Sequence, residues 1–294
     1  MSLAEGGRTA RWRKASAPPL WRARRRRDAT WAWFRCAIGI LSRGAGRYSV
    51  LLSQLEDARR GARGPTMKLL IGNKNYSSWS MRPWVLLRQF DIPFEEVMVR
   101  FDSFDADSAF KRAVGAVSPT GRVPVLVDDD GFAVWDSLAI AETLAETFPD
   151  RALWPRDRQR RARARSVCAE MHGGFGALRE HFTMNIEAVL PAVGARVLAE
   201  QAPVRADLAR VVALWQDALA GSGGPFLFGD YSIADAFFAP VVTRLRTYAL
   251  PVPADIAAYM ARVLASPGVA AWIADALQER TFVAFDEPYR QSRD

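Results

Sequence analysis

Two adjacent hydroxyls are the side chains of this sequence best suited to chemistry on a bound anion. Ser77 and Ser78 lie in the run 75–83, between a short apolar segment and a stretch whose apolar residues have helical spacing. Hydroxyls and free backbone N–H groups at a helix N-terminus can donate hydrogen bonds to a negative group. Serine also caps helices in a purely structural role. The spacing leaves both roles open and does not choose between Ser77 and Ser78.

Two further segments combine backbone and side-chain features suited to binding. Pro124 stands early in the apolar run 123–127, which is unusual because proline cannot donate to a strand ladder. An edge strand would also explain it. Asp136 and Ser137 begin a stretch with helical spacing, and an ordinary Asp or Ser helix cap would explain them.

A third group of polar and aromatic residues occurs near the middle of the chain. His172, Phe175 and Arg179 lie around the junction of two predicted helices. Arg179 could hold a substrate carboxylate. The spacing is not specific, so a surface arginine and polar surface histidines remain the alternative interpretation.

Cysteine and histidine are too few for a disulfide scaffold or a histidine-rich metal site. The 294 residues contain two of each, and no Cys-x-x-Cys pair occurs. We therefore expect no metal cofactor.

The residues above need a small sheet with helices to position them. Strands are expected at 68–71, 94–99, 123–127 and 132–135, and helices at 81–90, 106–116 and 136–147. The run 128–131 is a predicted hairpin turn. This β-α-β-α-β-β-α order predicts an α/β domain over residues 67–148.

The remainder of the chain has the pattern of an all-α domain over residues 157–286. A linker with Pro149 and Pro155 precedes it. Helices are expected at 158–173, 177–190, 204–220, 233–248, 253–265 and 269–278. Ser232 and Asp235 have the spacing of a capping box, a structural role.

The positive charge of the protein belongs to residues 1–66. This leader holds 15 Lys and Arg against 4 Asp and Glu, whereas residues 67–294 hold 25 against 28. Its apolar run 31–41 is shorter than the ~20 residues of a membrane helix. We expect a disordered leader or a misassigned start, with Met67 as the natural beginning, and no membrane partner. The alternative is a leader whose arginines contact the phosphates of a nucleic acid, which the charge balance of the remaining chain disfavours.

The order of elements and four local motifs resemble the cytosolic glutathione transferase family. Residues 75–83 look like the Ser-Ser-Cys-Ser-x-Arg stretch of zeta-like members, with Trp79 in place of the cysteine. Residues 119–126 resemble Pro-x-Gly-Lys-Val-Pro-x-Leu, with Arg122 for the lysine. Residues 136–137 and the box at 232–235 also have family counterparts. The resemblance implies a thioredoxin-like domain followed by a helical domain.

The resemblance also implies how glutathione is bound. Ser77 or Ser78 would donate a hydrogen bond to the glutathione sulfur. A cis bond before Pro124 would turn the Val123 backbone toward the cysteinyl unit. Ser137 would hold the γ-glutamyl carboxylate and Asp136 the γ-glutamyl ammonium group. The implied glutathione-binding residues are Trp79, Arg122, Val123, Pro124, Asp136 and Ser137, and the implied electrophile-site residues are His172, Phe175 and Arg179.

The function implied is a cytoplasmic, homodimeric glutathione transferase that detoxifies small electrophiles or peroxides, with glutathione as co-substrate. One alternative is a glutathione-dependent isomerase of the maleylacetoacetate type, which Trp79 in the cysteine position disfavours. The other alternative is a non-catalytic protein that uses the same fold as a binding scaffold.

Overall fold

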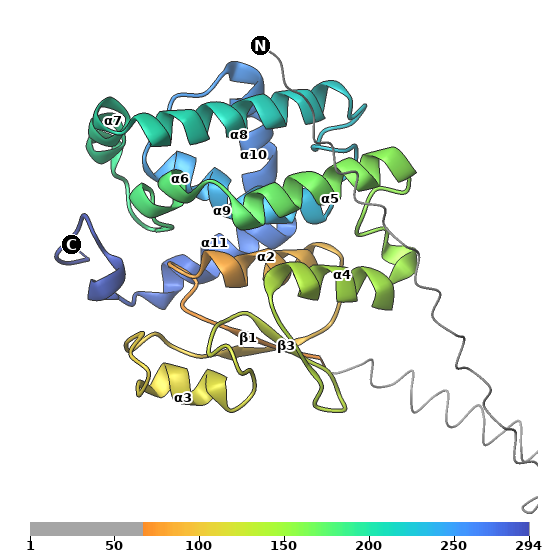
Figure 1. The fold of residues 1–294 in the computed structure, drawn as a ribbon, viewed down its shortest axis with the longest axis vertical. Coiled ribbons are helices and arrows are strands. Elements are labelled where there is room, and N and C mark those ends of the chain that lie inside the picture. The colour runs from red at the N-terminus through yellow and green to blue at the C-terminus, as the bar shows by residue number, and fades with distance from the viewer. Residues whose placement is uncertain (1–66, 294) are drawn as a thin grey trace, which may run out of the picture. The chain divides into compact units, whose positions relative to one another are not determined.

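The computed structural model describes residues 67–293, and its first part is a four-stranded mixed sheet (Figure 1). The strands are β1 (Lys68–Ile71), β2 (Glu95–Met98), β3 (Val125–Val127) and β4 (Ala133–Val134). Their order is β2-β1-β3-β4, with β1 parallel to β2 and antiparallel to β3. The expected strands are therefore all present, each shorter by a residue or more at its ends, except β1, which matches its predicted bounds.

Helices cover both faces of this sheet, which explains why β1 is apolar on both sides. Helices α2 (Ser78–Gln89) and α4 (Ser137–Thr147) lie on one face, and α3 (Ala109–Gly115) lies on the other (Figure 1). Leu69 and Ile71 join the large core beneath α2, whereas Leu70 joins the small cluster formed with Phe110 of α3. Helix α2 begins three residues earlier than predicted, so Ser78 and Trp79 are in its first turn.

The second part of the described chain is helical. Its helices are α5 (Arg158–Gly173), α6 (Gly176–His181), α7 (Pro191–Glu200), α8 (Ala202–Ala220), α9 (Ile233–Thr247), α10 (Ala254–Ala265) and α11 (Pro267–Glu279), with short 3₁₀ turns at Pro149–Arg151 and Ala284–Asp286.

One predicted helix is wrong and one observed helix was not predicted. The helix expected at 177–190 ends at His181, and a separate helix α7 begins at Pro191. Backbone N–H groups between them bond elsewhere: Ile186 N–H donates to Asn75 Oδ1 at 2.8 Å, and Leu190 N–H donates to the Thr247 carbonyl at 2.8 Å. Proline cannot donate a helical hydrogen bond, so a new helix starts there.

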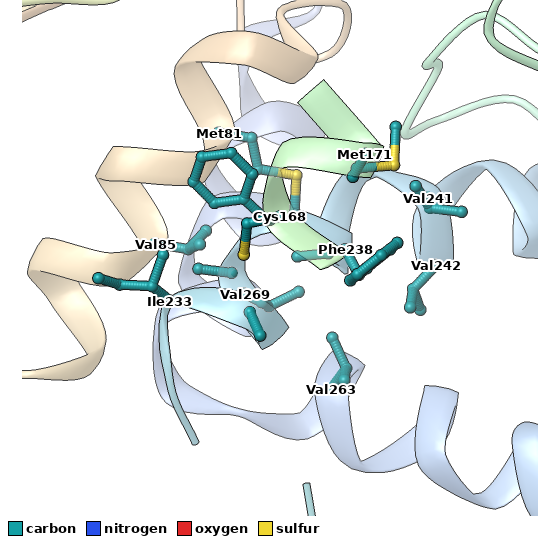
Figure 2. Close-up of a cluster of buried hydrophobic side chains, with 14 of the residues drawn as sticks. Met81, Val85, Cys168, Met171, Ile233, Phe238, Val241, Val242, Val263 and Val269 are labelled. Atoms are coloured by element: carbon teal, nitrogen blue, oxygen red, sulfur yellow. The ribbon is translucent and has the colours of Figure 1, made fainter. Parts of the chain in front are cut away.

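Helix α9 is the centre of the core. Every residue of α9 except Arg246 is buried, and the helix packs against α2, α5 and α10. Figure 2 shows buried side chains that meet there, including Met81 of α2, Cys168 of α5 and Phe238 of α9. Cys168 is a free thiol whose pKa is raised by burial, as expected of a packed core residue. Helix α11 can approach α2 closely because Gly268 has no Cβ. Any other residue there would bring its Cβ into collision with the Val85 carbonyl oxygen.

The predicted capping box at the start of α9 is confirmed. Ser232 Oγ accepts from Ala234 N–H at 3.3 Å, and Asp235 accepts from Ser232 N–H at 2.9 Å. The Asp235 carboxylate also accepts from Leu227 N–H and from the Tyr259 hydroxyl. Burial raises the pKa of Asp235 to about 6. This carboxylate therefore ties the entry of α9 to α10 and to the preceding loop.

Several expectations concern the whole chain. The leader 1–66 lies outside the described residues, so the expectations for it stay predictions. Over residues 67–293, no single helix is long and apolar enough to cross a membrane. Helices α10 and α11 together reach that length and apolarity, but the chain bends by 72° between them. The same residues contain no group of three or more His, Cys, Asp or Glu that could hold a metal ion.

Candidate functional site

Two cavities meet beside the start of α2. The first, of about 590 Å³, is lined by Tyr76, Ser77, Ser78, Trp79, Phe101, Phe104, Phe110, Lys111, Arg122, Val123, Arg179, Thr183, Met184, Arg244 and Asp286. The second, of about 600 Å³, is lined by Trp79, Thr120, Arg122, Val123, Pro124, Trp135, Asp136, Ser137 and His172. Trp79, Arg122 and Val123 line both cavities. One elongated ligand could therefore occupy the two together.

The Ser77 hydroxyl is turned toward the inside of its own helix. Ser77 occupies the N-cap position of α2, and its Oγ donates to Ser80 Oγ at 2.7 Å. Ser80 Oγ also accepts from Gly72 N–H at 3.2 Å, which connects the helix to the end of β1. The single proton of Ser77 is therefore used within the protein.

The Ser78 hydroxyl has a different environment. Its Oγ accepts a hydrogen bond from Arg244 Nη2 at 3.2 Å. Because a hydroxyl has one proton and two lone pairs, this contact occupies an acceptor position and leaves the Ser78 proton for another group. Ser78 lines the first cavity, so the group that receives its proton can be a ligand.

Arg244 comes from the last turn of α9, in the helical part of the chain. Its guanidinium also donates to the Phe182 carbonyl at 2.7 Å and to the Pro240 carbonyl at 3.2 Å. The residue is only 4% exposed, and burial lowers the pKa of its guanidinium to about 10. Arg244 is therefore still charged at neutral pH and is fixed in place by backbone contacts.

Four positively charged side chains, Lys111, Arg122, Arg179 and Arg244, line the first cavity. Arg82, Arg179 and Arg244 are close enough to repel one another, and desolvation followed by this repulsion lowers the pKa of Arg82 well below its usual value. Within residues 67–293, Arg82 Nη2 and Arg179 Nε are buried without a hydrogen-bond partner. The centroid of the Trp79 ring is 4.1 Å from Arg82 Cζ and 5.5 Å from Arg179 Cζ. The cavity is suited to an anion.

The second cavity contains a helix N-terminus with a free hydroxyl. Asp136 is the N-cap of α4 and accepts from Leu138 N–H at 2.9 Å. Ser137 is fully buried, and among the described residues its Oγ has no hydrogen-bond partner. A buried hydroxyl of this kind is costly unless a ligand satisfies it, and a carboxylate is the ligand that a helix N-terminus favours.

The bond between Val123 and Pro124 is cis, as the resemblance implied. Val123 precedes the first residue of β3 and lines both cavities, with Arg122 beside it. A ligand that occupied both cavities would therefore contact Val123.

The three residues expected around the electrophile site are separated. Arg179 lines the first cavity. His172 lines the second instead, where its Nε2 is 3.0 Å from Asp136 Oδ2 and its ring makes an edge contact with Trp79. Phe175 is 6% exposed in the hydrophobic core and belongs to the lining of neither cavity in the described part of the chain.

Several residues of the first cavity were not anticipated from the sequence, among them Arg244, Asp286 and Tyr76. Arg244 could have been noticed as a charged residue within the apolar run that forms α9. Asp286 comes from the C-terminal segment, and burial, with repulsion from Glu287, raises its pKa to about 6. The Tyr76 hydroxyl donates to Glu287 Oε1 at 2.6 Å, and burial raises its pKa to about 12, so its proton is engaged.

The relatives of the chain agree with this architecture. It is 29% identical over 196 residues to "Probable maleylacetoacetate isomerase" of Caenorhabditis elegans, covering 63% of this chain and 86% of that protein. It is 36% identical over 103 residues to "Maleylacetoacetate isomerase" of Pseudomonas aeruginosa, covering 35% of this chain and 47%, about half, of that protein.

A solved structure and two family domains complete the comparison. The fold is similar, with a TM-score of 0.54 and 25% identity, to a glutathione transferase homolog from Burkholderia solved with bound glutathione, over 72% of this chain and 98% of that chain. Residues 76–147 match the glutathione S-transferase N-terminal domain, and residues 161–275 match the glutathione S-transferase C-terminal domain. With both domains present in their usual order, the chain belongs to the glutathione S-transferase family.

Proposed function

We propose that this protein is a glutathione transferase that activates the glutathione thiol for attack on a small electrophile or peroxide. The observation that carries the proposal is the Ser78 hydroxyl, whose proton is free for the sulfur while Arg244 occupies its acceptor side. A free thiol with a pKa of about 8.5 is only about 3% ionised at pH 7, whereas a pKa lower by two units gives roughly 75% thiolate. A hydroxyl donor at a helix N-terminus favours that shift.

Glutathione would span both cavities. The γ-glutamyl carboxylate would lie at Ser137 and the N-terminus of α4, and its ammonium group near Asp136. The cysteinyl backbone would pair with Val123, which places the sulfur at Ser78. The thiol proton passes to solvent, the sulfur forms a bond to the electrophilic carbon, and the leaving group departs with the electron pair of its broken bond.

A calorimetric titration with glutathione, followed by assays with a panel of electrophiles and peroxides, tests this function. Binding together with turnover of at least one acceptor supports the transferase. Binding without any turnover would favour the scaffold alternative, and the absence of binding would contradict both. Detoxification, cytoplasmic location and a homodimeric state belong to the same proposal.

The second candidate is a glutathione-dependent isomerase of the maleylacetoacetate type. The names of the two relatives above favour it, since in such an enzyme the same thiolate would add to the substrate and leave again. Trp79 occupies the position of the cysteine in the zeta-like motif, which favours the transferase. An isomerase assay with maleylacetoacetate distinguishes the two.

The two serines should differ when each is replaced by alanine. Ser78→Ala is expected to raise the pKa of bound glutathione by about one unit, because a hydrogen bond to the charged form is lost. Ser77→Ala should change it far less, because that hydroxyl donates to Ser80. Thiolate absorbance against pH measures both. Equal shifts in the two variants would contradict the assignment to Ser78.

Asp286→Asn should lower the pKa of bound glutathione by roughly half a unit to one unit at neutral pH. Asp286 shares the first cavity with Ser78 and, with a pKa of about 6, is negatively charged above that pH. Its charge then opposes the thiolate. Below pH 6 the wild-type carboxyl is protonated, so the two proteins should converge there. The check is the ratio of their kcat/KM values from pH 5 to 8, and a ratio independent of pH would contradict the prediction.

A further inference from the structure

The Ser78 hydroxyl needs a partner to direct its proton. A serine hydroxyl rotates freely and can equally donate to a nearby carbonyl or to water. Arg244 Nη2 removes this freedom by donating to Ser78 Oγ at 3.2 Å. Hydrogen bonds in such a chain polarise one another, so a hydroxyl that accepts from a guanidinium is a better donor to the next group.

The Arg244 side chain is buried, and hydrogen bonds to the protein backbone hold it in place. Its Nε and Nη1 donate to the Phe182 and Pro240 carbonyls, and its residue is 4% exposed. Two backbone contacts from different segments fix the plane of the guanidinium, and the third nitrogen is thereby aimed at Ser78. Arg244 also lines the first cavity itself, so its charge acts directly on whatever occupies that space.

The charged and titratable groups around Arg244 carry more positive than negative charge, so an additional anion would be attracted there. Arg179 adds positive charge, Tyr248 is a neighbour whose pKa is raised to about 12, and Asp286 supplies a carboxylate at longer range. Among residues 67–293, none of the ion pairs involves Arg82, Arg179 or Arg244. A thiolate at Ser78 would supply negative charge close to these three guanidinium groups, which would stabilise it.

We propose that Arg244 is the positioning residue for thiol activation: it directs the Ser78 proton toward the glutathione sulfur and places a fixed positive charge behind it. The inference rests on the proposed function and deepens it. It assigns part of the activation to the helical half of the chain, although glutathione itself would be bound mainly by the sheet-bearing half. Ser78 is then the donor because Arg244 reaches it, and Ser77 is excluded because its proton is held by Ser80.

The test compares the bound glutathione thiol in full-length variants by thiolate absorbance against pH. Arg244→Met should raise the pKa of the thiol by about 1–2 units, because an opposite charge near the sulfur is lost. The dissociation constant of glutathione should change far less, because the peptide frame lies in the second cavity. Arg244→Lys keeps the charge and should recover part of the shift, which a purely structural role would not produce.

Two control variants on α9 separate this role from general destabilisation. Arg246→Met removes a neighbouring guanidinium that donates to the Ile186 carbonyl, and Val242→Ala weakens the buried core shown in Figure 2. Both should leave the thiol pKa at the wild-type value. Melting temperatures recorded for every variant show which remain folded. If Arg244→Met does not fold, Arg244→Lys and Ser78→Ala still provide the comparison.

A double variant tests whether Arg244 acts through Ser78. Arg244→Met should shift the pKa less in a Ser78→Ala background than in the wild-type protein, because the two residues are in contact. Equal shifts in both backgrounds would overturn the positioning role. A wild-type thiol pKa in Arg244→Met, or an equal shift in Arg246→Met, would overturn the proposal as a whole. Failure of the proposed function is distinguishable, because the wild-type protein itself would then leave the thiol unshifted.

Discussion

Asp235→Ala should lower the free energy of unfolding by about 3–5 kcal/mol. The Asp235 carboxylate is fully buried and accepts from Leu227 N–H, Ser232 N–H and the Tyr259 hydroxyl. Alanine would leave these buried donors without a partner, and each unsatisfied donor costs about 1–3 kcal/mol. The variant would also lose half of the capping box that starts α9.

Denaturant unfolding of the wild-type and variant proteins measures this loss. Asp230→Ala is the matched control, because Asp230 lies five residues earlier and is exposed. Its effect should stay within about 0.5 kcal/mol. A difference of less than about 1 kcal/mol between Asp235→Ala and this control would contradict the structural role assigned to the carboxylate.

Ser137→Ala should weaken glutathione binding roughly 10- to 150-fold. If the γ-glutamyl carboxylate lies at the N-terminus of α4, the variant loses a charge-assisted hydrogen bond of about 1.5–3 kcal/mol. The Ser137 hydroxyl is buried, and within the described residues it has no other partner, so its removal should not disturb the protein without ligand.

Calorimetry gives the dissociation constants of glutathione. Ser166→Ala serves as the control, because Ser166 Oγ donates to the Ala162 carbonyl on the exposed face of α5. The pKa of bound glutathione should be the same in Ser137→Ala as in the wild-type protein, since in the proposed binding mode Ser137 would contact the peptide frame and not the sulfur. A dissociation constant unchanged by Ser137→Ala would remove this residue from the site.

The order of strands and helices was predictable because local signals mark most of it. Apolar runs give the strands, and Pro149, Pro155 and the Ser232 cap mark element boundaries. The break between α6 and α7 was not predictable in this way. It depends on hydrogen bonds from residues 186–190 to Asn75 and Thr247, which are distant in sequence.

The candidate site was predictable only in part, for a related reason. The motifs located Ser77, Ser78 and Ser137, because each stands next to a helix start. They could not separate Ser77 from Ser78, because the difference comes from side-chain contacts: Ser77 donates to Ser80, and Ser78 accepts from Arg244, which lies 166 residues beyond it. The same limit applies to Asp286, which reaches the cavity from the C-terminal segment. Contacts across the fold carry no periodic signal in a single sequence.

The measurement that tests the account most directly is the pKa of the glutathione thiol when bound to the wild-type protein. Thiolate absorbance is followed against pH, with the S-methylglutathione complex as the blank. The buried Tyr76 and Tyr248 titrate at about 12, outside the range of interest. The account predicts a thiol pKa of about 6.5, two units below that of an ordinary thiol. A thiol that binds with its ordinary pKa of about 8.5 would contradict it.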